Sequence, residues 1–386
     1  MGFLLEEFFL GFFSGFAGLL AFLHANTLLK LSSPFLWPGF SKAVFSSSLS
    51  FSKIVFELVP TLFFFAPSIS YGVSILPAQK LFFEGKGISA LKTTLACFFL
   101  AALLCLALAP PFFIALPLLD ALVSPFAGWV LLFVLGASFA SKQKRWASAF
   151  AFALSGVLGM ALFSKPFLPD PLFPLLSGLF GIPALLFSLN SPKPAQKEAG
   201  VANVDLKIIF WAVVFGGLSS LLPGLSPVVL VSLLFLFLEG AGAMVFVQAV
   251  AATLVSKTFF DFLAFVAIGK ARSGAVAFAS QGLSAGSLPS VLVAGVASLF
   301  LAIATMLLLY KRLSSLSLLG GNKVPLVVAV FLAAAVLAFQ GFLGLFAMAV
   351  AACLGVCAGL LGADKTSLLG CLFVPSLAFY FGFSLA

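Results

Sequence analysis

Residues 52–57 read Ser-Lys-Ile-Val-Phe-Glu, and residues 256–261 read Ser-Lys-Thr-Phe-Phe-Asp. The pattern Ser-Lys-x-x-Phe-acid therefore occurs once in each half of the 386-residue chain, both times inside strongly apolar sequence. A lysine and an acid are costly to bury in such surroundings unless they pair with each other or serve a function. The repetition indicates an internal duplication in which each copy keeps a polar site.

The composition defines the class of protein. Hydrophobic residues make up 63% of the chain and charged residues 8%, and the mean hydropathy is +1.26. These values exclude a soluble globular protein and predict an all-α, polytopic membrane protein surrounded by lipid. At roughly 20 residues for each span, the length allows about 10–13 membrane crossings. The net charge of +9 is spread over the loops without a basic cluster, so no nucleic-acid partner is expected.

A polar stretch near the midpoint divides the chain into two predicted repeats. Residues 191–207 are rich in proline, lysine and acids and are predicted to form a linker between residues 1–190 and residues 208–386. The halves correspond at three places in the same order. A glycine-rich helix that runs into a break comes first, the Ser-Lys-x-x-Phe-acid pattern follows, and a Gly-x-x-x-x-Pro segment comes near the end. The three pairs of segments are 15–27 with 216–227, 52–57 with 256–261, and 177–183 with 369–375.

The distribution of basic residues predicts how the repeats are oriented. The loop 141–146, the linker and the loop 311–323 all carry lysine or arginine, which places them in the cytoplasm by the positive-inside rule. The counterpart of the first of these loops in the second half, residues 340–341, is uncharged. This pattern is typical of inverted-topology repeats with broken helices. Lys270 and Arg272 are the exception, since the inverted arrangement puts them outside.

The helix breaks are the best candidates for a binding site. Residues 221–227 place Pro-Gly and Ser-Pro within a few positions, and a continuous transmembrane helix is not expected there because each proline removes a donor and clashes with the preceding turn. Half-helix N-termini at such a break offer free N–H groups and positive partial charge to an anion. The alternative is a pair of kinked helices whose buried polar groups satisfy one another. The predicted substrate-binding residues are His24, Asn26, Thr27, Pro223, Gly224 and Ser226.

The repeated charged residues are candidates for ion coupling. Lys53 and Glu57, like Lys257 and Asp261, are four residues apart, so each pair shares one helix face. The acids are predicted to bind a coupling cation or a proton near the substrate. The alternative is that each pair only neutralises itself and lowers the cost of membrane insertion, and Lys257 could instead be a counter-charge for an anionic substrate.

No motif in the chain indicates an enzyme. The sequence lacks a phosphate loop, a nucleophile elbow and a zinc motif, and it has one histidine. Cys353 and Cys357 are one helical turn apart, but few acids lie near them, so we interpret them as small packing residues. We therefore predict no catalytic residues, no metal site and no cofactor beyond Na⁺ or H⁺ as a coupling ion.

The series of motifs resembles a known family. The segments that carry the resemblance are 18–20 with 23–27, 76–77 with 84–87, 178–183, 222–227, 268–274 and 369–375. Together they are similar to the large membrane subunit of tripartite tricarboxylate transporters, and especially to its shorter archaeal stand-alone type. The family usually has Pro-Gly before its His-x-Asn segment, where this chain has Ala21-Phe22.

The resemblance implies a multi-span permease of the cell membrane for small organic anions, driven by an ion gradient. Bacterial members work with a small membrane subunit and a soluble solute-binding protein, whereas the archaeal type is not expected to need both. Our leading hypothesis is therefore an ion-coupled transporter for a carboxylate. The alternatives are a carrier of isoprenoid phosphates or other lipids, suggested by the phenylalanine content, and a non-transporting membrane scaffold, suggested by Ala21-Phe22.

Overall fold

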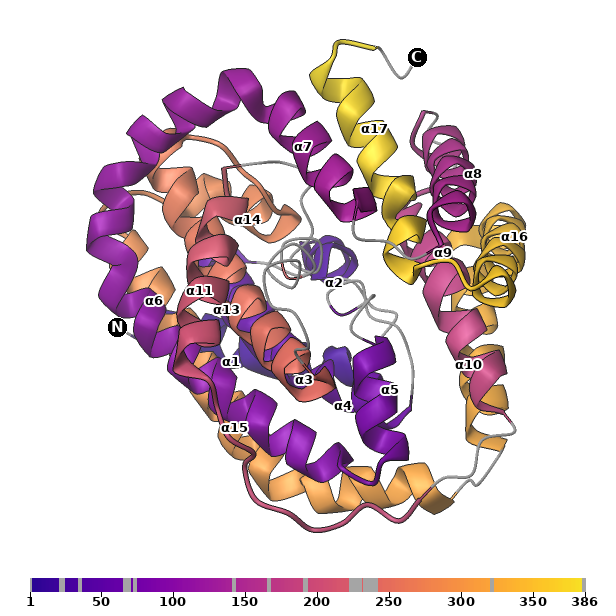
Figure 1. Cartoon of the computed structure of the whole chain (residues 1–386). Coiled ribbons are helices and arrows are strands. Elements are labelled where there is room, and N and C mark those ends of the chain that lie inside the picture. The colour runs from indigo at the N-terminus through magenta and orange to yellow at the C-terminus, as the bar shows by residue number, and fades with distance from the viewer. Residues whose placement is uncertain are drawn as a thin grey trace.

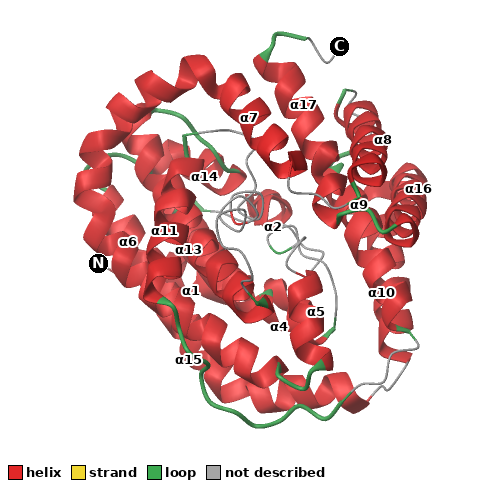
Figure 2. Ribbon diagram, viewed as in Figure 1, coloured by secondary structure: helices red, strands yellow, loops and turns green. Residues whose placement is uncertain are grey.

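The described part of the chain is helical throughout, with turns and loops but no strand (Figure 2). The computed structural model describes residues 2–20, 25–33, 37–64, 71, 75–140, 144–164, 168–189, 194–221, 231, 242–319 and 323–383. Its α-helices in the first half are α1 (Gly2–Ser14), α2 (Ala25–Ser32), α3 (Lys42–Phe56), α4 (Leu58–Phe63), α5 (Ile75–Phe83), α6 (Gly87–Val123), α7 (Ala127–Ala140), α8 (Arg145–Phe163), α9 (Leu172–Leu176) and α10 (Ile182–Ser188). Those of the second half are α11 (Leu206–Ser219), α13 (Ala243–Ile268), α14 (Gly274–Ala279), α15 (Leu288–Leu319), α16 (Val324–Leu361) and α17 (Gly370–Tyr380).

Several of these helices are long and apolar enough to cross a membrane. Within the described residues there are six such segments, and three shorter apolar helices accompany them. The six segments are Lys42–Phe63, Gly87–Phe133, Arg145–Phe163, Ala243–Ile268, Leu288–Ser315 and Pro325–Leu361. The protein is therefore an all-α, multi-pass membrane protein, as the composition predicts.

The helices pack around two separate apolar cores. The larger core joins α1–α6 with α10, α11, α13, α14, α15 and the N-terminal part of α16, and the smaller one joins α7, α8 and α9 with α17 and the C-terminal part of α16. In Figure 1 the larger body lies on the left and the smaller one on the right. Helix α16 serves both cores and bends at Gly341, whose φ of 69° is a left-handed conformation that glycine adopts without strain. Two separate spans are expected on either side of this glycine, and the backbone is indeed non-helical at Gly341, where the two helical parts of α16 meet.

Contacts between the two halves occur in reciprocal pairs. Helix α3 of the first half packs on α15 of the second, and α13 of the second half packs on α6 of the first. In the smaller body, α8 packs on α17 while α16 packs on α10. If α3 corresponds to α13, α6 to α15, α8 to α16 and α10 to α17, every contact has its mirror. This exchange is what a duplicated chain with intertwined halves would produce, and the inverted orientation of the halves stays a prediction.

Glycines allow the exchanged helices of the smaller body to approach closely. A Cβ atom on Gly159 of α8 would lie 2.1 Å from the carbonyl oxygen of Cys371, and one on Gly355 of α16 would lie 2.3 Å from that of Leu179. Small residues at helix contacts are the usual way for membrane helices to associate, because lipid provides no hydrophobic drive between them. In both contacts, therefore, a glycine lets the backbone of the neighbouring segment approach the helix closely.

The linker is bound to the larger body along one edge of the molecule (Figure 2). We call residues 194–205 the linker strap. The side chain of Gln196 accepts a hydrogen bond from the backbone N–H of Gly87 at 2.8 Å and donates one to the carbonyl of Phe82 at 3.0 Å. Glu198 binds Lys92 of α6 at 2.7 Å and Tyr310 of α15 at 2.7 Å. The strap is therefore a structured connection between α5, α6 and α15 in place of a free tether.

Candidate functional site

The first repeated pair lies on the most enclosed helix of the described chain. The span formed by α3 and α4 is entirely buried, although its sequence contains five serines and a charged pair. Most of the serine hydroxyls donate to carbonyls, either one turn back or on neighbouring helices. Ser46, for example, donates to Ala275 at 2.7 Å and Ser47 to Val291 at 2.9 Å. These bonds satisfy polar side chains that would otherwise be costly in an apolar interior.

We call the end of α3, the 3₁₀ turn η1 (Gly15–Leu19) and Tyr71 the first corner. In it, η1 lies directly on the backbone that carries Lys53 and Glu57. A Cβ on Gly18 would lie 2.7 Å from the carbonyl oxygen of Lys53 and 3.1 Å from the backbone nitrogen of Glu57. The chain leaves this turn at Leu20, immediately before the predicted first break. The glycine-rich sequence therefore brings the start of the break against the charged pair.

The charged pair of the first corner is closed off from solvent. Lys53 Nζ binds Glu57 Oε1, and their side chains are 4% and 2% exposed. Glu57 sits at the turn between α3 and α4, and the hydroxyl of Tyr71 donates to the carbonyl of Ile54 at 2.8 Å, one turn away. Among the residues that the structure describes, nothing donates a hydrogen bond to Glu57 Oε2. The carboxylate is thus half satisfied.

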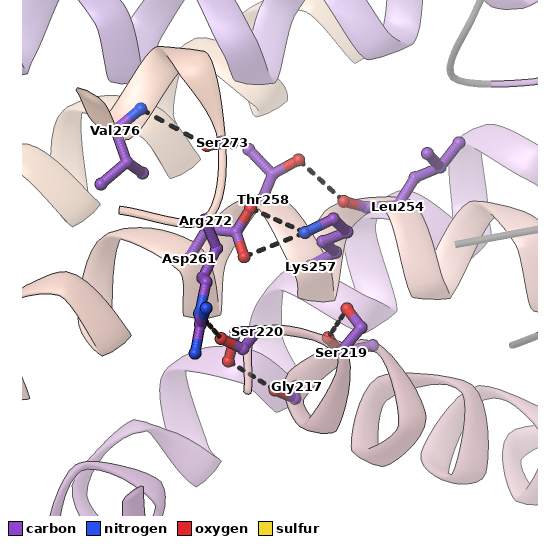
Figure 3. A network of polar contacts seen from close by, with 11 residues as sticks. Gly217, Ser219, Ser220, Leu254, Lys257, Thr258, Asp261, Arg272, Ser273 and Val276 are labelled. Carbon is purple, nitrogen blue, oxygen red and sulfur yellow. Dashed lines mark hydrogen bonds and ion pairs between the residues drawn. The ribbon is translucent and has the colours of Figure 1, made fainter. Parts of the chain in front are cut away.

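We call the C-terminal end of α11, the middle of α13 and Arg272 the second corner. Here Gly216 takes the place of the first-half glycines, since a Cβ on it would lie 2.7 Å from the Cβ of Ser256. Lys257 Nζ binds both oxygens of Asp261, at 3.1 and 2.9 Å (Figure 3). The Asp261 side chain is 3% exposed and that of Lys257 is 19% exposed. This carboxylate is satisfied by its own lysine.

Arg272 completes the second corner and was not expected from the sequence. Its guanidinium donates to the carbonyl of Ser220 at 3.2 Å and to that of Leu221 at 2.8 Å, as Figure 3 shows for Ser220. These carbonyls directly follow the C-terminal end of α11, where a cation is favoured by the helix dipole. Helix α13 ends at Gly269, whose φ of 71° lets the chain turn back toward α11.

An acid of the first half completes the surroundings of Arg272. Asp120 of α6 lies 3.6 Å from the guanidinium and 2.6 Å from Lys270 Nζ. Lys270 and Arg272 are therefore held by specific partners. In the sequence, the only indication that these two residues matter is their place in the glycine-rich segment 268–274, which is one of the segments that carry the family resemblance.

The predicted site residues are placed only in part. His24, Pro223, Gly224 and Ser226 lie outside the described residues, so the meeting of the two breaks stays a prediction. Asn26 and Thr27 lie in the first turn of α2, which begins at Ala25. The four charged residues Lys53, Glu57, Lys257 and Asp261 form two separate pairs, on helices that contact each other. Within the described residues, no group of three or more metal-ligating side chains occurs.

Comparisons with known proteins agree with the motif series. A family model described as the tripartite tricarboxylate transporter TctA family matches residues 5–207, which include the first corner but not the second. An uncharacterized protein of the archaeon Methanocaldococcus jannaschii is 28% identical over 280 residues, covering 69% of this chain and 70% of the relative. No solved structure matches the chain.

Proposed function

Because the chain belongs to the tripartite tricarboxylate transporter TctA family, which supplies the membrane subunit of such transporters, we propose that it is an ion-coupled permease for a small organic anion, a carboxylate. The observation that carries this proposal is that the described segment before each predicted break lies against a cationic residue, the buried Lys53 in the first half and the partly buried Arg272 in the second. The turn η1 packs on the backbone of Lys53, and Arg272 donates to the carbonyls of Ser220 and Leu221, just past the end of α11.

The substrate is proposed to bind where the two breaks approach each other. His24, Asn26 and Thr27 would contribute from the first half and Pro223, Gly224 and Ser226 from the second. Free N–H groups at the start of a half-helix favour a carboxylate, and a nearby lysine or arginine adds the opposite charge. Helix α2 begins within the first predicted segment, which is consistent with such a role.

Coupling is proposed to use an acid of one of the two buried pairs, Glu57 or Asp261. Glu57 and Asp261 are almost fully buried, and each lies near the point where a helix of its half ends. A buried acid beside a substrate site responds to the arrival of an anion because the local charge changes. The coupling ion would be H⁺ or Na⁺.

The architecture proposed for transport is a pair of inverted repeats in the cell membrane, residues 1–190 and 208–386, with the linker 191–207 in the cytoplasm. The reciprocal contacts between halves support the duplication. Members of tripartite systems work with a small membrane subunit and a solute-binding protein. Either could contact this chain, and the archaeal type is proposed to act without requiring both.

Uptake by proteoliposomes tests the proposal. The purified protein would be offered labelled citrate, succinate, glutamate and lactate, each under a proton or a sodium gradient. Gradient-dependent uptake of one of them supports the permease. Thermal stabilisation by polyprenyl phosphate without uptake would instead indicate a lipid carrier. If the protein shows neither uptake nor stabilisation, the result would indicate a scaffold.

A matched variant separates specific uptake from leakage. Replacing Pro223, Gly224 and Pro227 together by alanine should let the helix continue through the second break, because alanine restores the donors and the helix propensity. The variant should insert and remain folded but lose uptake. Liposomes without protein give the background. Uptake that is equal in the variant and in the unchanged protein would show that the second break is not part of the route.

A further inference from the structure

The two corners differ in how completely their carboxylates are satisfied. Asp261 has Lys257 Nζ on both oxygens, at 3.1 and 2.9 Å. Glu57 has Lys53 on Oε1 alone, and within the described residues Oε2 is buried without a hydrogen-bond partner. The pairs come from the same repeated motif, so the difference has arisen after the duplication.

A buried carboxylate oxygen without a donor is costly, and a bound cation would remove that cost. A metal ion on Oε2 would lie close to the Lys53 ammonium on the same carboxylate, and like charges at that separation repel strongly in a buried site. A proton does not meet this difficulty, because it neutralises the carboxylate itself. The chemistry of the first corner therefore favours H⁺ over Na⁺.

Within the part of the chain that the structure describes, few other charged groups lie near Glu57. Lys53 lies on its own helix, Tyr71 interacts with it electrostatically, and η1 carries no titratable side chain. The charged groups on the other elements packed on α3 and α4 are engaged or exposed. Lys80, Lys311 and Arg312 are exposed, Lys92 and Tyr310 bind Glu198, Asp120 binds Lys270, and Lys257 binds Asp261.

We propose that Glu57 binds the coupling proton on Oε2, and that the Lys257–Asp261 pair stays an ion pair throughout. This rests on the proposed transport function and names the residue that couples it. When an anionic substrate binds the Lys53 ammonium, the Glu57 carboxylate loses its counter-charge and takes up one H⁺ to become a carboxylic acid. The Lys53–Glu57 contact is replaced by a Lys53–substrate contact, and nothing is oxidised or reduced. One proton is taken up for each negative charge of the substrate that binds Lys53.

Glu7 is the rival candidate, because its Oε2 is also buried and without a partner among the described residues. Its Oε1 accepts a hydrogen bond from the backbone of Ser41, at the N-terminal end of α3. Glu57 follows the opposite end, roughly 24 Å away at 1.5 Å per residue. Among the described residues, Glu7 has no lysine partner that a substrate could take over. It therefore serves as the matched control.

Infrared spectroscopy tests the assignment without any substrate. The full-length protein in lipid nanodiscs would be titrated from neutral to acid pH, and the carbonyl stretch of protonated carboxylic acids followed in H₂O and D₂O. Glu57→Gln should remove a band that shifts in D₂O, whereas Glu7→Gln and Asp261→Asn should each retain it. If the band survives in Glu57→Gln, or disappears only in Glu7→Gln or Asp261→Asn, the assignment is wrong.

Two additions keep the test decisive. If Glu57→Gln does not fold, Glu57→Asp keeps a carboxyl at that place and should change the frequency of the carbonyl band. Asp261→Glu is its control and should leave the frequency unchanged. An unchanged frequency in Glu57→Asp would overturn the assignment. Because the readout needs no transport, a protein that shows the Glu57 band but takes up none of the labelled carboxylates would contradict the permease and leave the proton site standing. Uptake without a Glu57 band would do the reverse.

Discussion

The first and second corners begin from the same six-residue pattern and end in different states. In the first, Lys53 and Glu57 are enclosed and one carboxylate oxygen is free. In the second, Lys257 is partly exposed, Asp261 is fully bound, and Arg272 fixes the end of the neighbouring helix. The repeated motif places a charged pair in each half, and the surroundings of each pair decide how completely its carboxylate is satisfied.

Removing the lysine of each pair should produce the largest difference between the corners. Lys53→Met removes the counter-charge of a buried carboxylate, and breaking a buried pair in this way costs about 3–5 kcal/mol of unfolding free energy. Lys257→Met should cost less, because solvent reaches this pair and screens the loss. Thermal unfolding in nanodiscs measures both. Equal destabilisation would mean that the enclosure of the first corner has no energetic consequence.

Loss of the Arg272 clamp should have the next largest effect. Arg272→Gln leaves the carbonyls of Ser220 and Leu221 without their charged donor, and such hydrogen bonds are worth about 1.5–3 kcal/mol. Lys270→Gln is the matched control, since its side chain is 41% exposed and should matter less. Hydrogen exchange of the last turn of α11 should rise in the first variant only. A similar rise in both would assign the effect to Asp120 instead of the clamp.

The glycine contacts should be sensitive in both corners alike. Gly18→Ala and Gly216→Ala each place a Cβ within 3 Å of neighbouring atoms, and overpacking of this kind costs about 1–3 kcal/mol. Gly136→Ala in α7 is the control, because nothing lies within 4 Å of its Cβ position. A helical alanine there should be neutral or stabilising. The comparison would be sharpened if Gly18 proved more sensitive, because its neighbour is backbone that cannot move away easily.

The smallest effect is expected at the linker strap, away from both corners. Hydrogen bonds from Lys92 and Tyr310 lower the pKa of the Glu198 carboxyl from its ordinary value. The contact therefore contributes to stability above the ordinary glutamate pKa and loses its contribution as the pH falls through the lowered one. Hydrogen exchange of residues 197–202 should increase at acid pH and in Glu198→Gln. In Glu84→Gln, which removes only an exposed pair with Lys86, the strap should remain protected.

Much of this arrangement could be predicted from the sequence because it depends on local spacing. The i, i+4 separation placed Lys53 with Glu57 and Lys257 with Asp261, and both pairs form. Pro223 predicted the end of a helix, and α11 ends at Ser219. The motif series predicted the family, which the family model confirms.

What the sequence could not predict depends on contacts between distant segments. Arg272 reaches Ser220 only because α13 ends at a left-handed glycine and the following loop returns to α11. The sequence also cannot predict that Glu57 Oε2 is buried without a donor among the described residues, because this depends on how η1 and α4 pack around the turn. The linker strap was expected as a polar connection. Its bonds to Gly87 and Lys92 follow from packing of the two halves.

The most direct test of the central claim is gradient-driven uptake by the Glu57→Gln variant. With the carboxylate that the unchanged protein takes up from the labelled panel, a pH gradient should drive accumulation in the unchanged protein and in Glu7→Gln. Glu57→Gln should lose accumulation yet still exchange labelled for unlabelled substrate at equilibrium, and Asp261→Asn should still respond to the gradient. Accumulation by Glu57→Gln equal to that of the unchanged protein would contradict the account.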